Sequence, residues 1–263
     1  MRHLAHADGT HVPDGCRVQQ GAIDKTDGSL SSRLHRQGIV IGRGHGQSNP
    51  AHHLRPGPQL QWLGVVAPLL DQGFRRFGFC LGYLTDQVVA HLHRHWGWLR
   101  LSFHVDADPP GTGGSLLASR ALLDETFLLV MGDTYLDIEY RGLLDRLAAD
   151  ALGVMAVTDA VTEVPGNVEF GAGRVIPYGK ALGPHTRWVD TGALALRRRA
   201  LDLLASAPHP VDLGRLFERM IAKDELLAYP VDRPFYDIGT PQRLDRSAAY
   251  LARDSELRSP QPE

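Results

Sequence analysis

Long apolar runs, disulfide-forming cysteines and an excess of one charge are all missing from this sequence. No stretch of about 18 consecutive apolar residues occurs, so a membrane-spanning helix is not expected. The 2 cysteines, Cys16 and Cys80, are too few for a disulfide framework and do not form a C-x-x-C pair. The 28 basic and 30 acidic side chains leave a formal net charge of -2, which excludes a globally basic nucleic-acid-binding protein.

The first residues also lack the apolar stretch of a secretory signal. We therefore expect a cytoplasmic protein that binds neither nucleic acid nor a membrane. The sequence leaves the oligomeric state open, including a homo-oligomer.

Phe and Tyr are absent from the first 64 residues, which contain a single Trp and seven of the 13 histidines. This part shows no sustained period of 2 or 3.6 residues, and its one compact apolar run is residues 38–42. So few apolar side chains cannot offset the entropy lost on ordering the backbone. We predict that residues 1–64 are an atypical, disordered segment and that the folded domain comprises residues 65–263.

From residue 65 onward, short apolar runs alternate with amphipathic stretches. Residues 85–96 place three apolar side chains on one helical face, whereas residues 126–131 are apolar on both faces, which is typical of a strand covered by helices on both sides. Further strands are predicted near 77–81, 99–105, 153–158, 168–176, 188–196 and 226–231, and further helices near 65–72, 115–123, 141–150, 197–206, 211–222 and 241–252. This alternation predicts an α/β fold with a mostly parallel sheet flanked by helices.

Two aspartates occur in motifs suited to binding a cation. Asp133 follows the most apolar predicted strand, and ligands of open α/β sheets lie at the carboxyl ends of strands. Asp237 precedes a Gly-Thr-Pro sequence at the predicted start of the last helix. Because Mg²⁺ takes one or two protein carboxylates together with phosphate oxygens, the two aspartates could hold one ion. Each motif is also compatible with a turn that only ends a strand or starts a helix.

A third motif, Pro-Pro-Gly-Thr-Gly-Gly-Ser at residues 109–115, leads into a predicted helix. Its glycines allow a close approach of the backbone, and unpaired N–H groups at a helix start suit a nucleotide. Glycine-rich helix starts are common, so this motif alone is a weak signal.

Taken in order, residues 109–115, 128–137, 189–196 and 235–241 resemble the motifs of sugar-1-phosphate nucleotidylyltransferases. The chain is most similar to the branch of mannose-1-phosphate and D-glycero-D-manno-heptose 1-phosphate guanylyltransferases, over about residues 69–251. The resemblance implies a Rossmann-like nucleotide-diphospho-sugar transferase fold. It also implies a reaction in which a sugar 1-phosphate attacks the α-phosphorus of a nucleoside triphosphate, GTP being favoured, and pyrophosphate leaves. The nucleotide sugar formed would serve polysaccharide biosynthesis.

The resemblance also implies roles for individual residues. Asp133 and Asp237 would hold Mg²⁺, and Asp133 would act in catalysis together with Lys180, which would contact the sugar phosphate. The residues that would contact the nucleotide or the sugar are Gly111, Thr112, Gly113, Gly114, Glu169, Asp190 and Gly192. The last three are equally compatible with ordinary strand and turn positions.

Residues 1–64 depart from the pattern of the family, whose members begin with a strand that leads into Gly-Gly-x-Gly-Thr-Arg around the triphosphate. The nearest sequence here, residues 42–46, has glycines but no following Thr-Arg. We therefore predict that the N-terminal strand and the phosphate loop are missing. Since the loss of one preorganised donor costs roughly 10²–10³ in rate, we expect weak or no activity.

A shifted reading frame would explain this departure. Residues 41–48 read one base later, and residues 55–64 read two bases later, permit the two N-terminal motifs of the family in the correct order. We interpret residues 1–64 as largely out of frame, a hypothesis that the nucleotide sequence of the gene decides.

Two other functions stay open. Asp106 and Asp108 form a D-x-D pattern, which is typical of metal-dependent glycosyltransferases with a related (GT-A-like) fold. The non-enzymatic alternative is a catalytically dead protein that binds a sugar nucleotide. We interpret His91, His93 and His95 as a solvated helix surface, because no third ligand for a metal site is evident.

Overall fold

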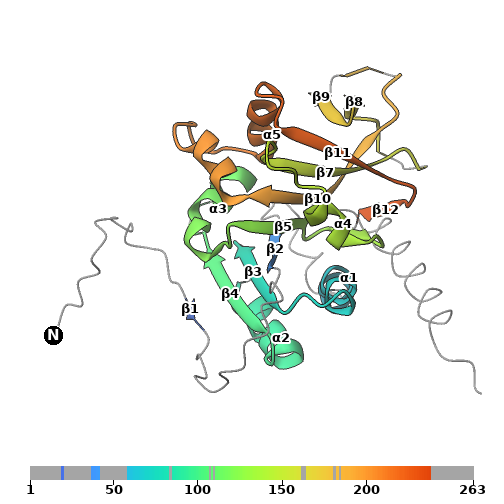
Figure 1. The fold of residues 1–263 in the computed structure, drawn as a ribbon. Coiled ribbons are helices and arrows are strands. Elements are labelled where there is room, and N and C mark those ends of the chain that lie inside the picture. The colour runs from blue at the N-terminus through green and yellow to red at the C-terminus, as the bar shows by residue number, and fades with distance from the viewer. Residues whose placement is uncertain are drawn as a thin grey trace, which may run out of the picture.

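The computed structural model describes residues 19–20, 37–41, 58–82, 85–106, 108, 110–160, 164–179, 182–183 and 185–237. It contains a large central sheet with helices on both faces (Figure 1). No helix within these residues is long and apolar enough to cross a membrane.

The central sheet has the strand order β1-β4-β3-β2-β5-β10-β7-β11-β9-β8. Its strands are β1 (Gln19–Gln20), β2 (Gln37–Ile41), β3 (Arg76–Leu81), β4 (Arg100–Val105), β5 (Thr126–Met131), β7 (Gly153–Thr158), β8 (Val168–Gly171), β9 (Arg174–Tyr178), β10 (Val189–Arg197) and β11 (Leu226–Val231). β4, β3, β2 and β5 run parallel to one another, as do β7 and β11, whereas the other neighbouring strands are antiparallel. A separate two-stranded sheet pairs β6 (Thr134–Leu136) with β12 (Phe235–Asp237).

The helices cover the two faces of the sheet in separate groups. They are α1 (Pro58–Asp71), α2 (Thr85–Trp96), α3 (Thr112–Ala118), α4 (Tyr140–Asp145) and α5 (Leu213–Ile221), with 3-10 turns η2 (Arg120–Leu122) and η3 (Arg198–Leu204). Apolar side chains of α3, η3 and α5 belong to one buried cluster, and those of α1, α2 and α4 belong to the other.

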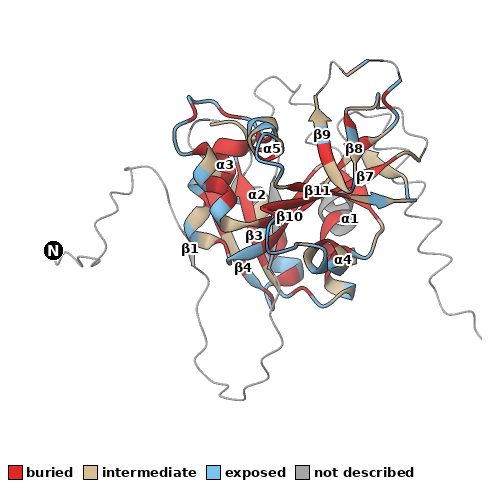
Figure 2. Cartoon of the chain, turned by 45° about the horizontal axis from the view of Figure 1, so that its top comes forward, coloured by how far each residue is buried: buried red, intermediate tan, exposed pale blue. Residues whose placement is uncertain are grey.

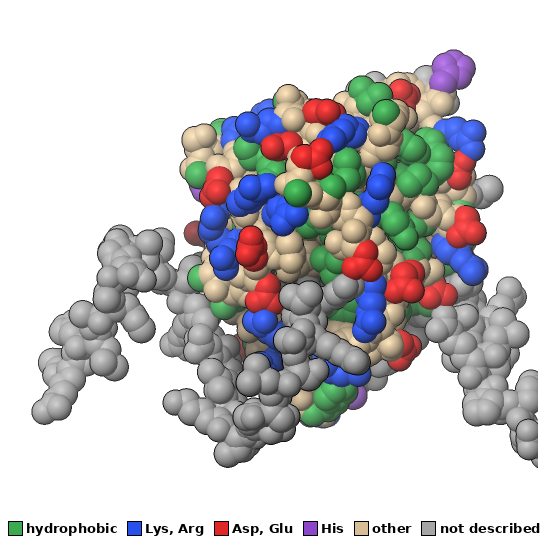
Figure 3. Space-filling view, viewed as in Figure 1, with side chains coloured by type: hydrophobic (Ala, Val, Ile, Leu, Met, Phe, Trp, Pro, Cys, Tyr) green, Lys and Arg blue, Asp and Glu red, His purple; other side chains and the backbone are tan. Residues whose placement is uncertain are grey.

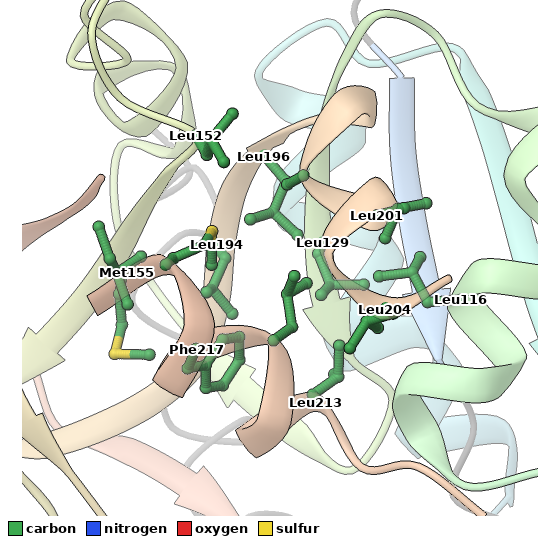
Figure 4. Close-up of a cluster of buried hydrophobic side chains, with 14 of the residues drawn as sticks. Leu116, Leu129, Leu152, Met155, Leu194, Leu196, Leu201, Leu204, Leu213 and Phe217 are labelled. Carbon is green, nitrogen blue, oxygen red and sulfur yellow. The ribbon is translucent and has the colours of Figure 1, made fainter. Parts of the chain in front are cut away.

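The strand β5 shows how the sequence produces these two layers. Side chains alternate between the faces of a strand, and here both faces are buried. Phe127, Leu129 and Met131 join the cluster under α3 and α5, part of which is drawn in Figure 4, while Leu128 and Val130 join the other. Figure 2 shows the buried residues concentrated along these central strands.

The predicted fold class is confirmed, and several details differ. The expectation that the N-terminal strand is missing is wrong, because β2 lies between β3 and β5 and pairs with both. The sheet is mixed rather than mostly parallel, and the strand predicted at 168–176 is the hairpin of β8 and β9. The predicted boundary between residues 64 and 65 falls inside α1, and the helix predicted at 241–252 lies outside the described residues.

Basic and acidic side chains are interspersed on the face of the molecule shown in Figure 3. The described part of that face carries no continuous patch of one charge.

Phe127→Ala tests the double-layered core. Phe127 is fully buried, so we expect a loss of about 3–5 kcal/mol in the free energy of unfolding, measured by urea denaturation. Thr126→Ala, at the exposed start of the same strand, should change it by less than about 0.5 kcal/mol. Equal effects of the two substitutions would contradict this packing.

Candidate functional site

The carboxyl ends of the central parallel strands meet at one edge of the sheet. Ile41, the last residue of β2, pairs with Cys80 of β3 on one side and with Met131 of β5 on the other. The antiparallel strand β10 begins at the same edge, because Ala193 pairs with Val130. Ligands of open α/β sheets bind at this edge.

The two predicted metal ligands are brought together by the small sheet. Asp133 is half-buried in the turn between β5 and β6, and its neighbour Thr134 pairs with Asp237 of β12. Opposed antiparallel residues have Cα atoms about 4.5–5.5 Å apart and consecutive Cα atoms are about 3.8 Å apart, so the Cα atoms of Asp133 and Asp237 lie within about 9 Å. The backbone therefore satisfies the requirement that both residues approach one ion. The side chain of Asp237 lies outside the described residues.

A β-bulge in β10 lies against the same turn. The register of β10 against β7 shifts between Asp190 and Leu194, and Gly192 has a φ of 76°. An added Cβ at Gly192 would lie 3.0 Å from Cγ of Met131 and 3.3 Å from Oγ1 of Thr134. A glycine is required here by both the positive φ and the close approach.

The side chain of Asp190 holds this bulge in place. Its Oδ1 accepts a hydrogen bond of 2.9 Å from the N–H of Gly192, and its own N–H donates to Oδ1 of Asn167 at 2.9 Å. The hydroxyl of Tyr178 lies 3.5 Å from Oδ2 of Asp190. Sequence reasoning missed Asn167, just before β8, and Tyr178, at the end of β9, because the hairpin of β8 and β9 carries none of the motifs.

Glu169 lies in β8, two residues after Asn167. Its side chain is exposed, and Oε1 accepts a hydrogen bond of 2.9 Å from Oγ1 of Thr186. Because Asn167 is bonded to Asp190, which is bonded to Gly192, the segment that carries Glu169 lies next to the one that carries Asp190 and Gly192. Lys180 lies outside the described residues, so its role stays a prediction.

Residues 110–114, which we call the Gly-rich turn, are packed against residues 209–213, just before and at the start of α5. Gly111 has a φ of 82°, and an added Cβ would lie 2.4 Å from the carbonyl oxygen of Val211. That oxygen accepts hydrogen bonds from the N–H groups of Gly113 and Gly114, at 2.9 and 3.0 Å. Oγ1 of Thr112 accepts a further bond of 3.0 Å from the N–H of Leu213.

These bonds contradict the prediction that unpaired N–H groups at the start of α3 are free to bind a nucleotide. The N–H groups of Gly113 and Gly114 are not unpaired, because Val211 uses both of them. The close backbone approach expected of the glycines is real, but here it is to another segment of the chain. Nothing in the sequence around Val211 signals this contact.

Comparisons with known proteins bear on the fold. No protein-family model matches the chain, and no curated protein matches it. Among solved structures, HddC from Yersinia pseudotuberculosis complexed with GMP-PN has a TM-score of 0.66 at 18% identity, covering 82% of this chain and 99% of that chain. The inositol-1-phosphate CTP transferase of T. maritima has a TM-score of 0.68 at 15% identity, covering 87% and 98%.

A third neighbour, from Bacillus anthracis and assigned as a glucose-1-phosphate thymidylyltransferase, was solved in complex with sucrose. It has a TM-score of 0.71 at 16% identity, covering 83% of this chain and 96% of that chain. The chain has the nucleotide-diphospho-sugar transferase fold. Its neighbours are sugar-phosphate nucleotidyltransferases that use different nucleotides.

Within this fold, Asp106 is engaged by protein partners. Its Oδ1 lies 2.9 Å from Nε2 of His104, and its Oδ2 accepts a 2.5 Å hydrogen bond from Oγ of Ser115. Asp108, the second residue of the D-x-D pattern, is exposed. Among the described residues, no group of three or more His, Cys, Asp and Glu is arranged to hold a metal ion.

Cys80 lies near the end of β3, beside the carboxylate of Asp106. Burial raises the pKa of its thiol to about 11, an effect partly offset by hydrogen bonding with Ser119. The thiolate is therefore scarce at neutral pH, and Cys80 is a packing residue of the strand end rather than a nucleophile.

Gly111→Ala tests the contact between the Gly-rich turn and Val211. Both the positive φ and the overlap with the carbonyl oxygen oppose a Cβ, so we expect a loss of about 2–4 kcal/mol in the free energy of unfolding. Gly183→Ala is the matched control, since Gly183 has a φ of 96° but, among the residues that the structure describes, no atom lies within 4 Å of an added Cβ. It should show only the backbone cost of about 1–2 kcal/mol. An equal loss in the two variants would show that the contact is not formed.

Proposed function

We propose that this chain is a nucleotidylyltransferase. It joins a sugar 1-phosphate to a nucleoside triphosphate and releases a nucleotide sugar and pyrophosphate. GTP is the favoured nucleotide, in keeping with the sequence resemblance, and a mannose or heptose 1-phosphate is the favoured sugar. A cytoplasmic location and a role in polysaccharide biosynthesis are parts of the same proposal.

The pairing of Thr134 with Asp237 is the single observation that carries the proposal. It brings two positions 104 residues apart, Asp133 and Asp237, to the edge of the sheet where β2, β3 and β5 end. Two carboxylates at a strand edge suit a hard cation that also binds phosphate oxygens. A turn that only ended β5 would need neither of the two carboxylates.

Mg²⁺ fits the donors that these positions offer. Asp133 is half-buried beside Gly192, and oxygen donors are the ligands this ion prefers. When bound, Mg²⁺ would neutralise negative charge on the phosphates during the transfer. In the proposal, Asp133 and Asp237 hold the ion, and Lys180 contacts the sugar phosphate.

Around the ion, the other predicted residues would position the substrates. The bulge at Gly192, held by Asp190, lies against Met131 and Thr134, which are close to Asp133 in the sequence. In the proposal, Asp190, Gly192 and Glu169 contact the sugar. Gly111, Thr112, Gly113 and Gly114 would contact the nucleotide through groups other than the two N–H groups bonded to Val211. Such chemistry depends on positioning and charge neutralisation rather than on a covalent intermediate.

The sequence after β2 is expected to limit activity. β2 lies between β3 and β5 and ends at the edge of the sheet where the triphosphate would bind. Residues 42–47 read Gly-Arg-Gly-His-Gly-Gln and lack the family's Thr-Arg. The chain as written should therefore turn over slowly.

The glycosyltransferase alternative is weakened by Asp106, because both of its carboxylate oxygens are bonded to protein partners. A catalytically dead nucleotide binder differs from the proposal only in yielding no product, so turnover separates them.

A loop replacement tests the proposal. Residues 42–47 are exchanged for Gly-Gly-x-Gly-Thr-Arg, and pyrophosphate release is measured with GTP, Mg²⁺ and mannose 1-phosphate or heptose 1-phosphate. We expect the replacement to raise turnover by roughly 10²-fold or more, because it restores backbone donors to the triphosphate. Fast turnover by the unaltered chain would contradict the predicted weak activity.

Two substitutions in the loop-restored chain complete the test. Asp133→Asn should abolish the gain, whereas Asp202→Asn, on a surface residue paired with Arg120, should leave it unchanged. Saturable GTP binding without product in every variant would favour the dead binder. Hydrolysis of a nucleotide sugar without any triphosphate chemistry would favour the glycosyltransferase.

A further inference from the structure

Three polar side chains, two buried and one largely buried, form a continuous hydrogen-bonded chain beside the Gly-rich turn. Asp106 lies in the middle, with Oδ1 2.9 Å from Nε2 of His104 and Oδ2 2.5 Å from Oγ of Ser115. The side chains of His104 and Asp106 are 5% and 11% exposed, and Ser115 is 6% exposed. None of the three is needed to bind the metal in the proposed function.

The chain of bonds connects the strand ends to the helix across the turn. Asp106 is the first residue after β4, and its N–H donates a 2.9 Å bond to the carbonyl oxygen of Leu81 at the end of β3. Ser115 lies in the first turn of α3. Asp106 therefore joins two strand ends to the helix start, through its backbone N–H to β3 and through its carboxylate to His104 of β4 and Ser115 of α3.

The other side of the turn is held by Val211, whose carbonyl oxygen is bonded to Gly113 and Gly114. On that side the N–H of Leu213 also donates a bond of 3.0 Å to Oγ1 of Thr112. The bond between Asp106 and Ser115 is the contact that ties the helix start to the ends of β3 and β4.

A carboxylate is well suited to this position. An O–H···O⁻ bond of 2.5–2.7 Å is typical of a charge-assisted hydrogen bond, which is about twice as strong as a neutral one. Loss of a partner would leave a buried polar group unsatisfied, which costs more than the bond itself contributes. These properties favour a fixed position for the hydroxyl of Ser115 rather than a hydroxyl that exchanges hydrogen-bond partners.

We infer that Asp106 is a positioning residue for the nucleotide. It acts through Ser115 by fixing the turn at Gly111 and Thr112, and it touches neither the substrate nor the metal. The inference rests on the proposed function, since it assumes that a nucleotide binds at this turn. It predicts that the bond between Asp106 and Ser115 affects nucleotide affinity but not sugar 1-phosphate affinity.

Ser115→Ala tests the inference, with Ser119→Ala as the matched control. Both serines are buried at α3, and both hydrogen-bond with the thiol of Cys80, but the hydroxyl of Ser119 donates to the carbonyl oxygen of Leu116 instead of to Asp106. Calorimetry of the full chain with GTP and Mg²⁺ should show affinity about tenfold lower for Ser115→Ala and unchanged for Ser119→Ala. Affinity for mannose 1-phosphate should be unchanged in both. Equal GTP affinities in the two variants would overturn the inference.

Amide hydrogen exchange provides a readout that needs no ligand. Exchange at Gly113 and Gly114 should be about tenfold faster in Ser115→Ala than in the wild-type chain, and unchanged in Ser119→Ala. If neither the wild-type chain nor the loop-restored chain binds GTP, the proposed function fails, and the exchange rates still decide whether Asp106 fixes the turn. Equal exchange in the three proteins would show that it does not.

Discussion

The antiparallel pairing of Thr134 with Asp237 is the contact on which the candidate site depends. It folds the end of the described chain back onto the turn that follows β5, a strand buried on both faces. Without it, Asp133 would be a lone carboxylate at a strand end. With it, Asp237 of β12 lies at the sheet edge where the parallel strands β2, β3 and β5 end.

This edge is built by core packing together with the hydrogen bonds of the strands and of Asp190. β5 is buried on both faces by helices from different parts of the sequence, and β2 lies beside it in the same register. The bulge at Gly192 then fits against Met131 and Thr134, because no Cβ intervenes. A rigid strand end, a bulge and a paired aspartate therefore occupy one place, which is what a reaction that depends on positioning requires.

The sequence predicted much of this where the signal is local. The bounds of α2, β5, β7 and β11 follow from apolar periodicity and agree with the structure. Residues 38–42 were too short a run to predict a central strand, because the position of β2 is set by its pairing with β3 and β5. Local pattern cannot report what lies across the sheet.

The site shows the same division. Asp133 and Asp237 could be proposed from motifs, but their approach depends on a strand pairing between distant segments. Val211 and Asn167 were missed for that reason, and the N–H groups of Gly113 and Gly114 are used by a partner about 100 residues away. Glycine-rich sequence predicts close approach, but not what approaches.

Manganese binding measured by electron paramagnetic resonance tests most directly whether the two aspartates hold one ion. The measurement compares the unaltered chain with Asp133→Asn, Asp237→Asn and the double variant. The account predicts that each single substitution removes most of the affinity and that the second adds little to the first, because both act on one site. Independent, additive losses, or binding that neither substitution changes, would contradict it.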